Sequence, residues 1–217
     1  MGRELFESEL NEVRQQLLSL SREAVEAVRE SVEVLKTRDM RRGRGLIDND
    51  ERINYHCYEV EEACLNIIAT QQPVAGDLRL LFSVLQISNE LERIADYAKG
   101  IARINERIGD QPLVKPLVDV PRMCEITTSM LEGAIRSFLE TDEKAAREIP
   151  GRDVEVDMLY NQIHRELLTY VMSDPNHLEQ AMMLIWVAHN LERVGDRVVN
   201  ICERIIFTLT GEVVDLD

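Results

Sequence analysis

The stretch NLERVGDRVVNI, which spans Asn190–Ile201, repeats the pattern of NELERIADYAKGI at Asn89–Ile101. Both segments contain Leu-Glu-Arg followed by an aspartate, and both place this acidic pair inside an otherwise apolar run. Identities at a spacing of 100 residues include Leu78, Leu91, Glu92, Arg93, Asp96 and Ile101. The repeated segment therefore indicates that the chain holds two copies of one structural unit.

Earlier positions also align, at a slightly larger spacing. Asp39 matches Asp142, and Asp50 matches Asp153, each 103 residues later, so the second copy has lost three residues before its last segment. Self-similarity on this scale is typical of duplicated supersecondary units, whose short connections force neighbouring elements to pack together.

Each copy shows helical periodicity in three segments. In the first copy we predict helices over Leu10–Lys36, over a run around Ile53–Ile67 that stops before Pro73, and from Asp77, as a helix N-cap, to about Ile108. In the second copy we predict helices over Arg122–Glu140, Asp142–Tyr170 and Leu178 to about Thr210.

Between the copies lies GDQPLVKPLVDVP at Gly109–Pro121, whose three prolines cannot continue a helix. We therefore predict an all-α fold built from two tandem, similar three-helix bundles with six long antiparallel helices. The first bundle would occupy residues 1–112 and the second residues 113–217.

Composition excludes several classes of protein. The net charge of −15 repels phosphate backbones, so nucleic acid is not expected as a partner. No apolar run approaches the roughly 20 residues of a membrane helix, and the charged N-terminal segment has no apolar signal-peptide region. The four cysteines form no CxxC pair and lie among apolar neighbours. We expect a soluble protein in a reducing, cytoplasmic compartment.

The repeated acidic pairs occupy a defined face of their helices. At about 100° per residue, the apolar residues around Leu91 and Leu191 form one line that builds each bundle. Glu92 with Asp96, and Glu192 with Asp196, lie on a second line roughly opposite. Like charges at i and i+4 cost a few tenths of a kcal/mol unless a cation lies between them. The pairs are therefore either solvated surface charges or metal ligands.

The middle helix of each copy offers partners for these pairs. Asp153 and Asp157 are again four residues apart, and the first copy has Asp50 but a neutral Asn54 at the matching position. Carboxylates from facing helices are how helical bundles build metal sites. The candidate metal ligands are Asp50, Glu92, Asp96, Asp153, Asp157, Glu192 and Asp196. Because Asn54 removes one charge, we expect weaker metal binding, or none, in the first copy.

Other polar residues allow more than one interpretation. His189 could add a nitrogen ligand or could be a hydrogen-bonded packing residue, and Arg41, Arg42 and Arg44 could face a partner or form a solvated turn. No nucleophile-base set, Walker loop or dinucleotide-binding turn occurs, so we expect a non-enzymatic protein. The alternatives are a metal-free helical adaptor and a metal-dependent hydrolase that uses a carboxylate cluster.

Several of these segments resemble the PhoU family of phosphate-transport regulators. The resemblance rests on QQPVAGDLR at Gln71–Arg79, the two repeats LERIADYAKGI and LERVGDRVVNI, and QPLVKPLVDVP at Gln111–Pro121. It implies two three-helix bundles that often form a homodimer, and a cytoplasmic negative regulator of the phosphate-starvation response.

The same resemblance implies partners and cofactors. PhoU proteins are thought to couple the ATPase of a phosphate ABC transporter to a sensor histidine kinase, so contact with the membrane would occur only through partners. Some members hold multinuclear iron or zinc clusters on acidic motifs that match Glu92, Asp96, Asp153, Asp157, Glu192 and Asp196. Asn54 departs from that acidic pattern.

Overall fold

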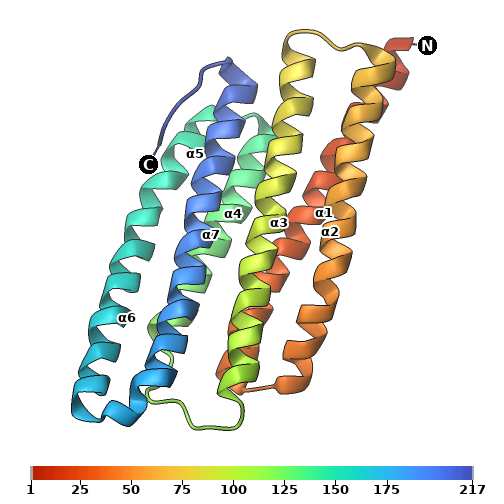
Figure 1. Cartoon of the computed structure of the whole chain (residues 1–217). Coiled ribbons are helices and arrows are strands. Elements are labelled where there is room, and N and C mark those ends of the chain that lie inside the picture. Colours follow the sequence, from red (N-terminus) through yellow and green to blue (C-terminus); the bar gives the residue numbers. More distant parts are fainter. Residues whose placement is uncertain (1, 217) are drawn as a thin grey trace.

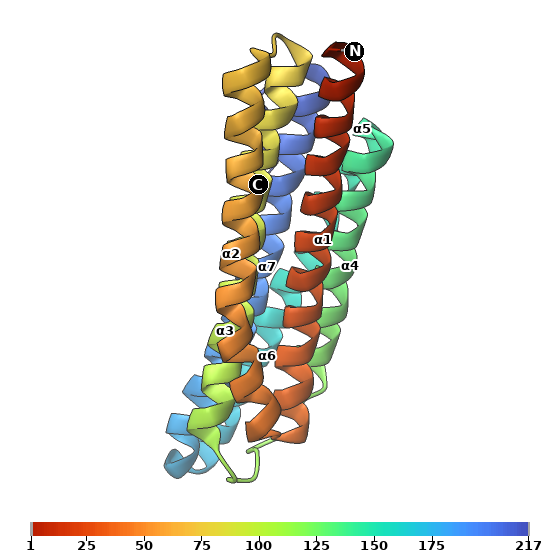
Figure 2. The ribbon, with the colours of Figure 1, turned by 90° about the vertical axis from the view of Figure 1, so that its right-hand side faces the viewer.

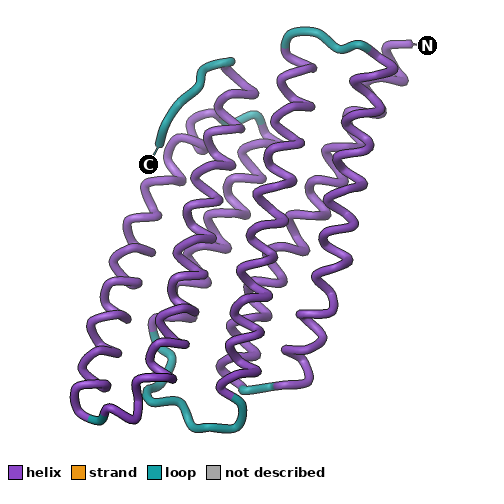
Figure 3. Tube along the Cα trace, in the orientation of Figure 1, coloured by secondary structure: helices purple, strands orange, loops and turns teal. Residues whose placement is uncertain are grey.

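The computed structural model describes residues 2–216, and within this range the chain forms helices and loops without strands (Figure 3). The long helices are α1 (Gly2–Thr37), α2 (Met40–Gln71), α3 (Gly76–Ile108), α4 (Asp119–Glu140), α6 (Asp153–Ser173) and α7 (Leu178–Thr210). The short elements are α5 (Glu143–Glu148) and the 3-10 turns η1 (Ile149–Arg152) and η2 (Pro175–His177). The predicted all-α class is confirmed.

The six long helices form two bundles that pack side by side. α1, α2 and α3 contact one another, as do α4, α6 and α7, while α3 packs against α7 and α1 against α4. In Figure 1 the α3–α7 pair lies at the centre, with α2 and α6 on opposite outer sides. Figure 2 shows α1 and α4 together on the side away from α2. The predicted pair of similar three-helix bundles is confirmed.

The predicted apolar lines form the core of each bundle. Leu91 and its neighbours on α3, and Leu191 and its neighbours on α7, are buried, because the two helices each turn this line toward their own bundle. The four cysteines are also buried and free. Burial raises the pKa of the Cys64 and Cys202 thiols to about 12, so both behave as small apolar core residues.

One helix that the sequence predicts as continuous is interrupted in the structure. The segment Asp142–Tyr170 does not form a single helix, because it divides into α5, η1 and α6. Pro150 has no backbone N–H to donate and adopts the tighter turn of η1, where it is buried. The matching helix α2 contains no proline and runs unbroken over Met40–Gln71. The aligned residues Asp39 and Asp142 have the same role, since Asp39 caps α2 and Asp142 caps α5.

The start of α3 also differs from the prediction. The N-cap is Ala75, with φ of 49° and no side-chain capping bond, and Asp77 lies in the first turn. There its carboxylate still interacts favourably with the positive end of the helix dipole. The predicted helix ends at Ile108 and Thr210 are confirmed.

The segment between α3 and α4 is held against the second bundle. The buried Gln180 side chain accepts a hydrogen bond from Val114 N at 2.5 Å and donates one to Pro112 O at 3.0 Å. The buried ammonium of Lys115 pairs with Glu166 of α6. Pro121 lies in the first turn of α4, where its missing N–H breaks no helical bond. The predicted boundary at residues 112 and 113 falls within this loop.

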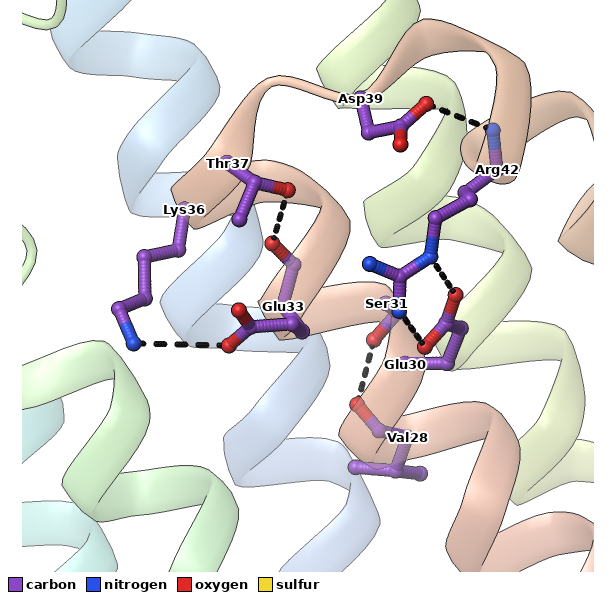
Figure 4. A network of polar contacts seen from close by, with 8 residues as sticks. All are labelled: Val28, Glu30, Ser31, Glu33, Lys36, Thr37, Asp39 and Arg42. Carbon is purple, nitrogen blue, oxygen red and sulfur yellow. Dashed lines mark hydrogen bonds and ion pairs between the residues drawn. The ribbon is translucent and has the colours of Figure 1, made fainter.

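The arginines at the start of α2 are largely engaged within the protein. The Arg42 guanidinium donates two hydrogen bonds to the Glu30 carboxylate, at 2.8 and 2.7 Å, beside the Asp39 cap (Figure 4). Arg44 pairs with Glu106 of α3 at 2.9 Å. Arg41 is exposed. Two of the three arginines therefore stabilise the junction of the first bundle, which favours a structural role for this turn.

Within residues 2–216, no helix is long and apolar enough to span a membrane.

Candidate functional site

The first acidic face comprises Asp50 and Asn54 of α2 with Glu92 and Asp96 of α3. The face forms because α2 and α3 are packed neighbours, as the bundle prediction requires. Asn54 Nδ2 donates to Asp50 Oδ2 at 3.4 Å. Burial, followed by the charges of Asp96 and Asp50, raises the pKa of Glu92 above its ordinary value. Electrostatic coupling therefore links the carboxylates of the two helices.

Lys99 completes this face. Its Nζ lies 2.5 Å from Asp50 Oδ2 and 3.2 Å from Asp96 Oδ1, so one ammonium bridges α2 and α3. Asp50 is 5% exposed, and the Lys99 side chain is 19% exposed. A buried carboxylate requires such a partner, because an unpaired charge away from water is costly. The sequence-based reasoning missed Lys99, although its mismatch with Val199 at the repeat spacing was a readable signal.

The second acidic face comprises Asp153 and Asp157 of α6 with Glu192 and Asp196 of α7. Burial, followed by the charge of Asp196, raises the pKa of Asp157. The same two causes in the same order raise the pKa of Glu192, with a smaller contribution from Asp157. Three carboxylates on two helices therefore repel one another. The structure brings together the residues that the repeat pattern placed on one face.

Gly195 positions Asp153 on this face. A Cβ at residue 195 would lie 3.2 Å from Asp153 Cγ and would clash with Asp153 Oδ1, at a distance far below 3.0 Å. The carboxylate therefore rests directly on the α7 backbone, one residue before Asp196. In the first copy, Ala95 stands at the matching position.

Arg193 and His189 are the basic side chains nearest to the second face. Arg193 NH1 lies 2.7 Å from Asp196 Oδ2, and the guanidinium also bonds with Tyr97 on α3. His189 Nδ1 lies 3.3 Å from Glu192 Oε2, while the ring packs against Trp186. His189 therefore packs against an aromatic side chain and also lies next to a candidate ligand.

The donor chemistry of the second face suits a divalent cation. Glu192 Oε2 is buried and accepts no hydrogen bond, and the His189 ring, whose Nδ1 lies 3.3 Å away, compensates its charge only when that ring is protonated. Carboxylate oxygens are ligands for hard cations such as magnesium and manganese. In the conformation that the structure describes, however, no three His, Cys, Asp or Glu side chains within residues 2–216 converge as a metal site. The second face therefore places the carboxylate donors near one another but does not hold them in the arrangement of a bound metal site.

A separate cavity lies between α1 and α2. It has a volume of about 530 Å³, and its lining includes Glu23, Glu30 and Asp50. Arg42 pairs with Glu30 at 2.7 Å, and Arg52 lies 3.5 Å from Glu23, so these two glutamates already have cationic partners. Asp50 links this cavity to the first acidic face.

Comparison with known proteins agrees with this architecture. The sequence model of the PhoU domain family matches this chain twice, at residues 17–105 and 120–205, with one match in each bundle. The phosphate-specific transport system accessory protein PhoU homolog of Aquifex aeolicus is 34% identical over 206 residues, which cover 95% of this chain and 93% of the relative. The homologue of the same name from Clostridium acetobutylicum is 33% identical over 218 residues and is matched along the full length of both chains.

Two solved structures share the fold along almost the whole chain. The phosphate transport system regulatory protein PhoU from Streptococcus pneumoniae has a TM-score of 0.90 at 27% identity, with 97% of this chain and 100% of that chain covered. PhoU from Pseudomonas aeruginosa also has a TM-score of 0.90, at 31% identity, with 95% and 100% covered. By domain match, full-length identity and shared fold, the chain belongs to the PhoU family.

Proposed function

We propose that this protein is a regulator of phosphate uptake that damps phosphate-starvation signalling. The observation that carries this proposal is the full-length similarity to proteins named as phosphate-specific transport system accessory proteins. A non-enzymatic role is part of the proposal, since the names of these relatives describe accessory and regulatory proteins. By family resemblance, the protein would work in the cytoplasm as a homodimer, between a transporter ATPase and a sensor histidine kinase.

The exposed surface supports a role in binding partners. Large apolar side chains remain exposed along one face at the N-terminal end of α7, where Leu178 is 52%, Met182 46% and Trp186 55% exposed. Exposed apolar side chains that gather in this way often mark protein contacts. Since Glu192 of the second acidic face follows Trp186 on α7 by less than two helical turns, a partner bound to this end of α7 would lie close to that carboxylate.

The metal-binding part of the proposal rests on the second acidic face. Asp157, Glu192 and Asp196 would hold a divalent metal ion, with Asp153 positioned beside them over Gly195. A bound cation would neutralise carboxylates that otherwise repel one another and would link α6 to α7. The support is the buried Glu192 Oε2, which accepts no hydrogen bond and has the His189 ring as its basic neighbour, next to two further carboxylates.

Affinity capture tests the regulatory role. The full-length protein carrying a C-terminal affinity tag is recovered from phosphate-replete cells, and co-purified proteins are identified by mass spectrometry. We expect the ATPase subunit of a phosphate transporter or a sensor kinase, and weaker recovery with the Trp186→Ala variant. Tyr58→Ala on α2, where Tyr58 is 67% exposed, is the matched control. Recovery of neither partner class, together with normal repression of a phosphate-starvation reporter in a deletion strain, would contradict this role.

A metal-free adaptor is the second candidate. It is favoured by the pairing of Asp196 with Arg193 and of Asp96 with Lys99, because these contacts partly neutralise both faces without metal. Metal analysis of the purified protein separates the two candidates. The adaptor predicts no bound metal and an Asp196→Asn variant that behaves like the wild type, whereas the metal-binding regulator predicts metal that this variant loses.

A further inference from the structure

Lys99 joins two of the three carboxylates of the first acidic face. Its Nζ contacts Asp50 Oδ2 from α2 and Asp96 Oδ1 from α3, at 2.5 and 3.2 Å. An ammonium at this point donates charge-assisted hydrogen bonds to both helices, and a bridging metal ion would contact the same two carboxylates. The contact to Asp50 is largely shielded from water, since Asp50 is 5% exposed.

We infer that Lys99 is a built-in cation that takes the place of a metal ion in the first bundle and leaves metal binding to the second. This inference rests on the metal-binding part of the proposed function. Lys99 would thereby determine which of the two acidic faces binds metal, a distinction that neither the repeat pattern nor the acidic residues provide by themselves.

Comparison of the two faces isolates this lysine. Val199 occupies the matching position of the second bundle and is 2% exposed, so no ammonium enters the second face from there. Arg193 also brings a cation to the second face, 2.7 Å from Asp196 Oδ2, but both residues belong to α7, whereas Lys99 joins carboxylates of two helices. The first face thus holds three carboxylates, two of which share one ammonium, whereas the second holds four carboxylates, with Arg193 beside Asp196 and His189 beside Glu192.

Asn54 offers a competing explanation for a metal-free first face. It replaces the carboxylate of Asp157 by an amide, but it removes only one possible ligand. Lys99 instead engages two of the three remaining carboxylates directly. A divalent cation cannot bind these oxygens while the ammonium stays, because like charges at such distances repel strongly. Lys99 is therefore the stronger barrier to metal binding.

A titration of the full-length protein with Mn²⁺ tests the inference. Free Mn²⁺ is quantified by its electron paramagnetic resonance signal, for the wild type and for Lys99→Met, with Mn²⁺ present throughout purification of the variant. We expect Lys99→Met to bind more Mn²⁺ per chain than the wild type. Lys99→Arg keeps the charge and should bind the same amount as the wild type, and Asn54→Asp with Lys99 retained should gain less than Lys99→Met.

Three outcomes would overturn the inference. The first is that the wild type and Lys99→Met bind the same amount of Mn²⁺ per chain. The second is that Asn54→Asp gains as much Mn²⁺ as Lys99→Met does. The third is that Lys99→Met fails to fold even with saturating Mn²⁺, since the metal is expected to replace the ammonium. The wild-type titration separately tests the proposed function. A wild type without Mn²⁺ contradicts metal binding by the second face, whereas a gain in Lys99→Met over that baseline still supports the role of Lys99.

Discussion

Replacing Gly195 with alanine tests whether the Asp153 carboxylate belongs to the second acidic face. The added methyl group would lie 3.2 Å from Asp153 Cγ and far too close to Asp153 Oδ1, so the carboxylate must move away from α7. Asp153 is the first residue of α6, and its short side chain has little freedom to swing aside. The clash therefore separates Asp153 from Asp196 or shifts the two helices.

Two opposing contributions determine the size of the effect on stability. Alanine in a helix interior is favoured over glycine by about 1 kcal/mol, whereas overpacking a close contact costs about 1–3 kcal/mol. We expect Gly195→Ala to lower the free energy of unfolding by about 1 kcal/mol. In a chain of this length that change corresponds to a fall of about 2–4 °C in Tm. The loss of a positioned carboxylate should also weaken Mn²⁺ binding by roughly 10- to 100-fold.

Gly100→Ala in α3 is the matched control for this prediction. A Cβ at residue 100 would lie 3.4 Å from the Asn190 amide, an ordinary contact distance, so this variant should gain part of the helix-propensity term. Urea unfolding with and without Mn²⁺, together with a Mn²⁺ titration, measures both effects. The reasoning is refuted if Gly195→Ala is stabilised as much as Gly100→Ala and binds Mn²⁺ like the wild type.

Three further predictions concern the second bundle. Asp157→Asn should weaken Mn²⁺ binding in a calorimetric titration, whereas Asn54→Ala should leave it unchanged; equal effects would contradict the asymmetry between the two faces. Because the pKa of Glu192 is raised on folding, the metal-free protein should gain stability as the pH falls through that folded pKa toward the unfolded value. Glu192→Gln should lose this gain in urea unfolding at stepped pH, and an unchanged pH profile would show that Glu192 is not the group responsible. Leu191→Ala, at a fully buried position, should lower the free energy of unfolding by about 2–5 kcal/mol; a loss below about 1 kcal/mol would mean that the bundle repacks around the gap.

Much of the fold could be predicted because helical periodicity is a local property. The apolar spacing around Leu91 and Leu191 specifies one buried line in each long helix, whatever packs against it. The missed break in the second copy was also local, since Pro150 lies within the predicted helix. The N-cap of α3 was less predictable, because Asp77 is a good capping residue but the chain turns earlier, at Ala75.

The candidate site was predictable in its residues but not in its contacts. Repeat spacing placed Glu92 and Asp96 on one face, and the bundle topology placed Asp50 opposite them. The distance of Lys99 from Asp50 depends on how α2 and α3 are aligned lengthwise, which no pattern within one helix encodes.

The sequence by itself determined that this protein has two copies of a helical unit, each with an apolar line and an acidic line on its last helix, because side-chain directions repeat along any α-helix. The residues that differ between the copies can be read in the sequence, but only the tertiary structure decided what those residues contact. Packing places the Lys99 ammonium among the carboxylates of the first face and the Asp153 carboxylate against Gly195 in the second, because contacts between helices depend on their separation and relative alignment.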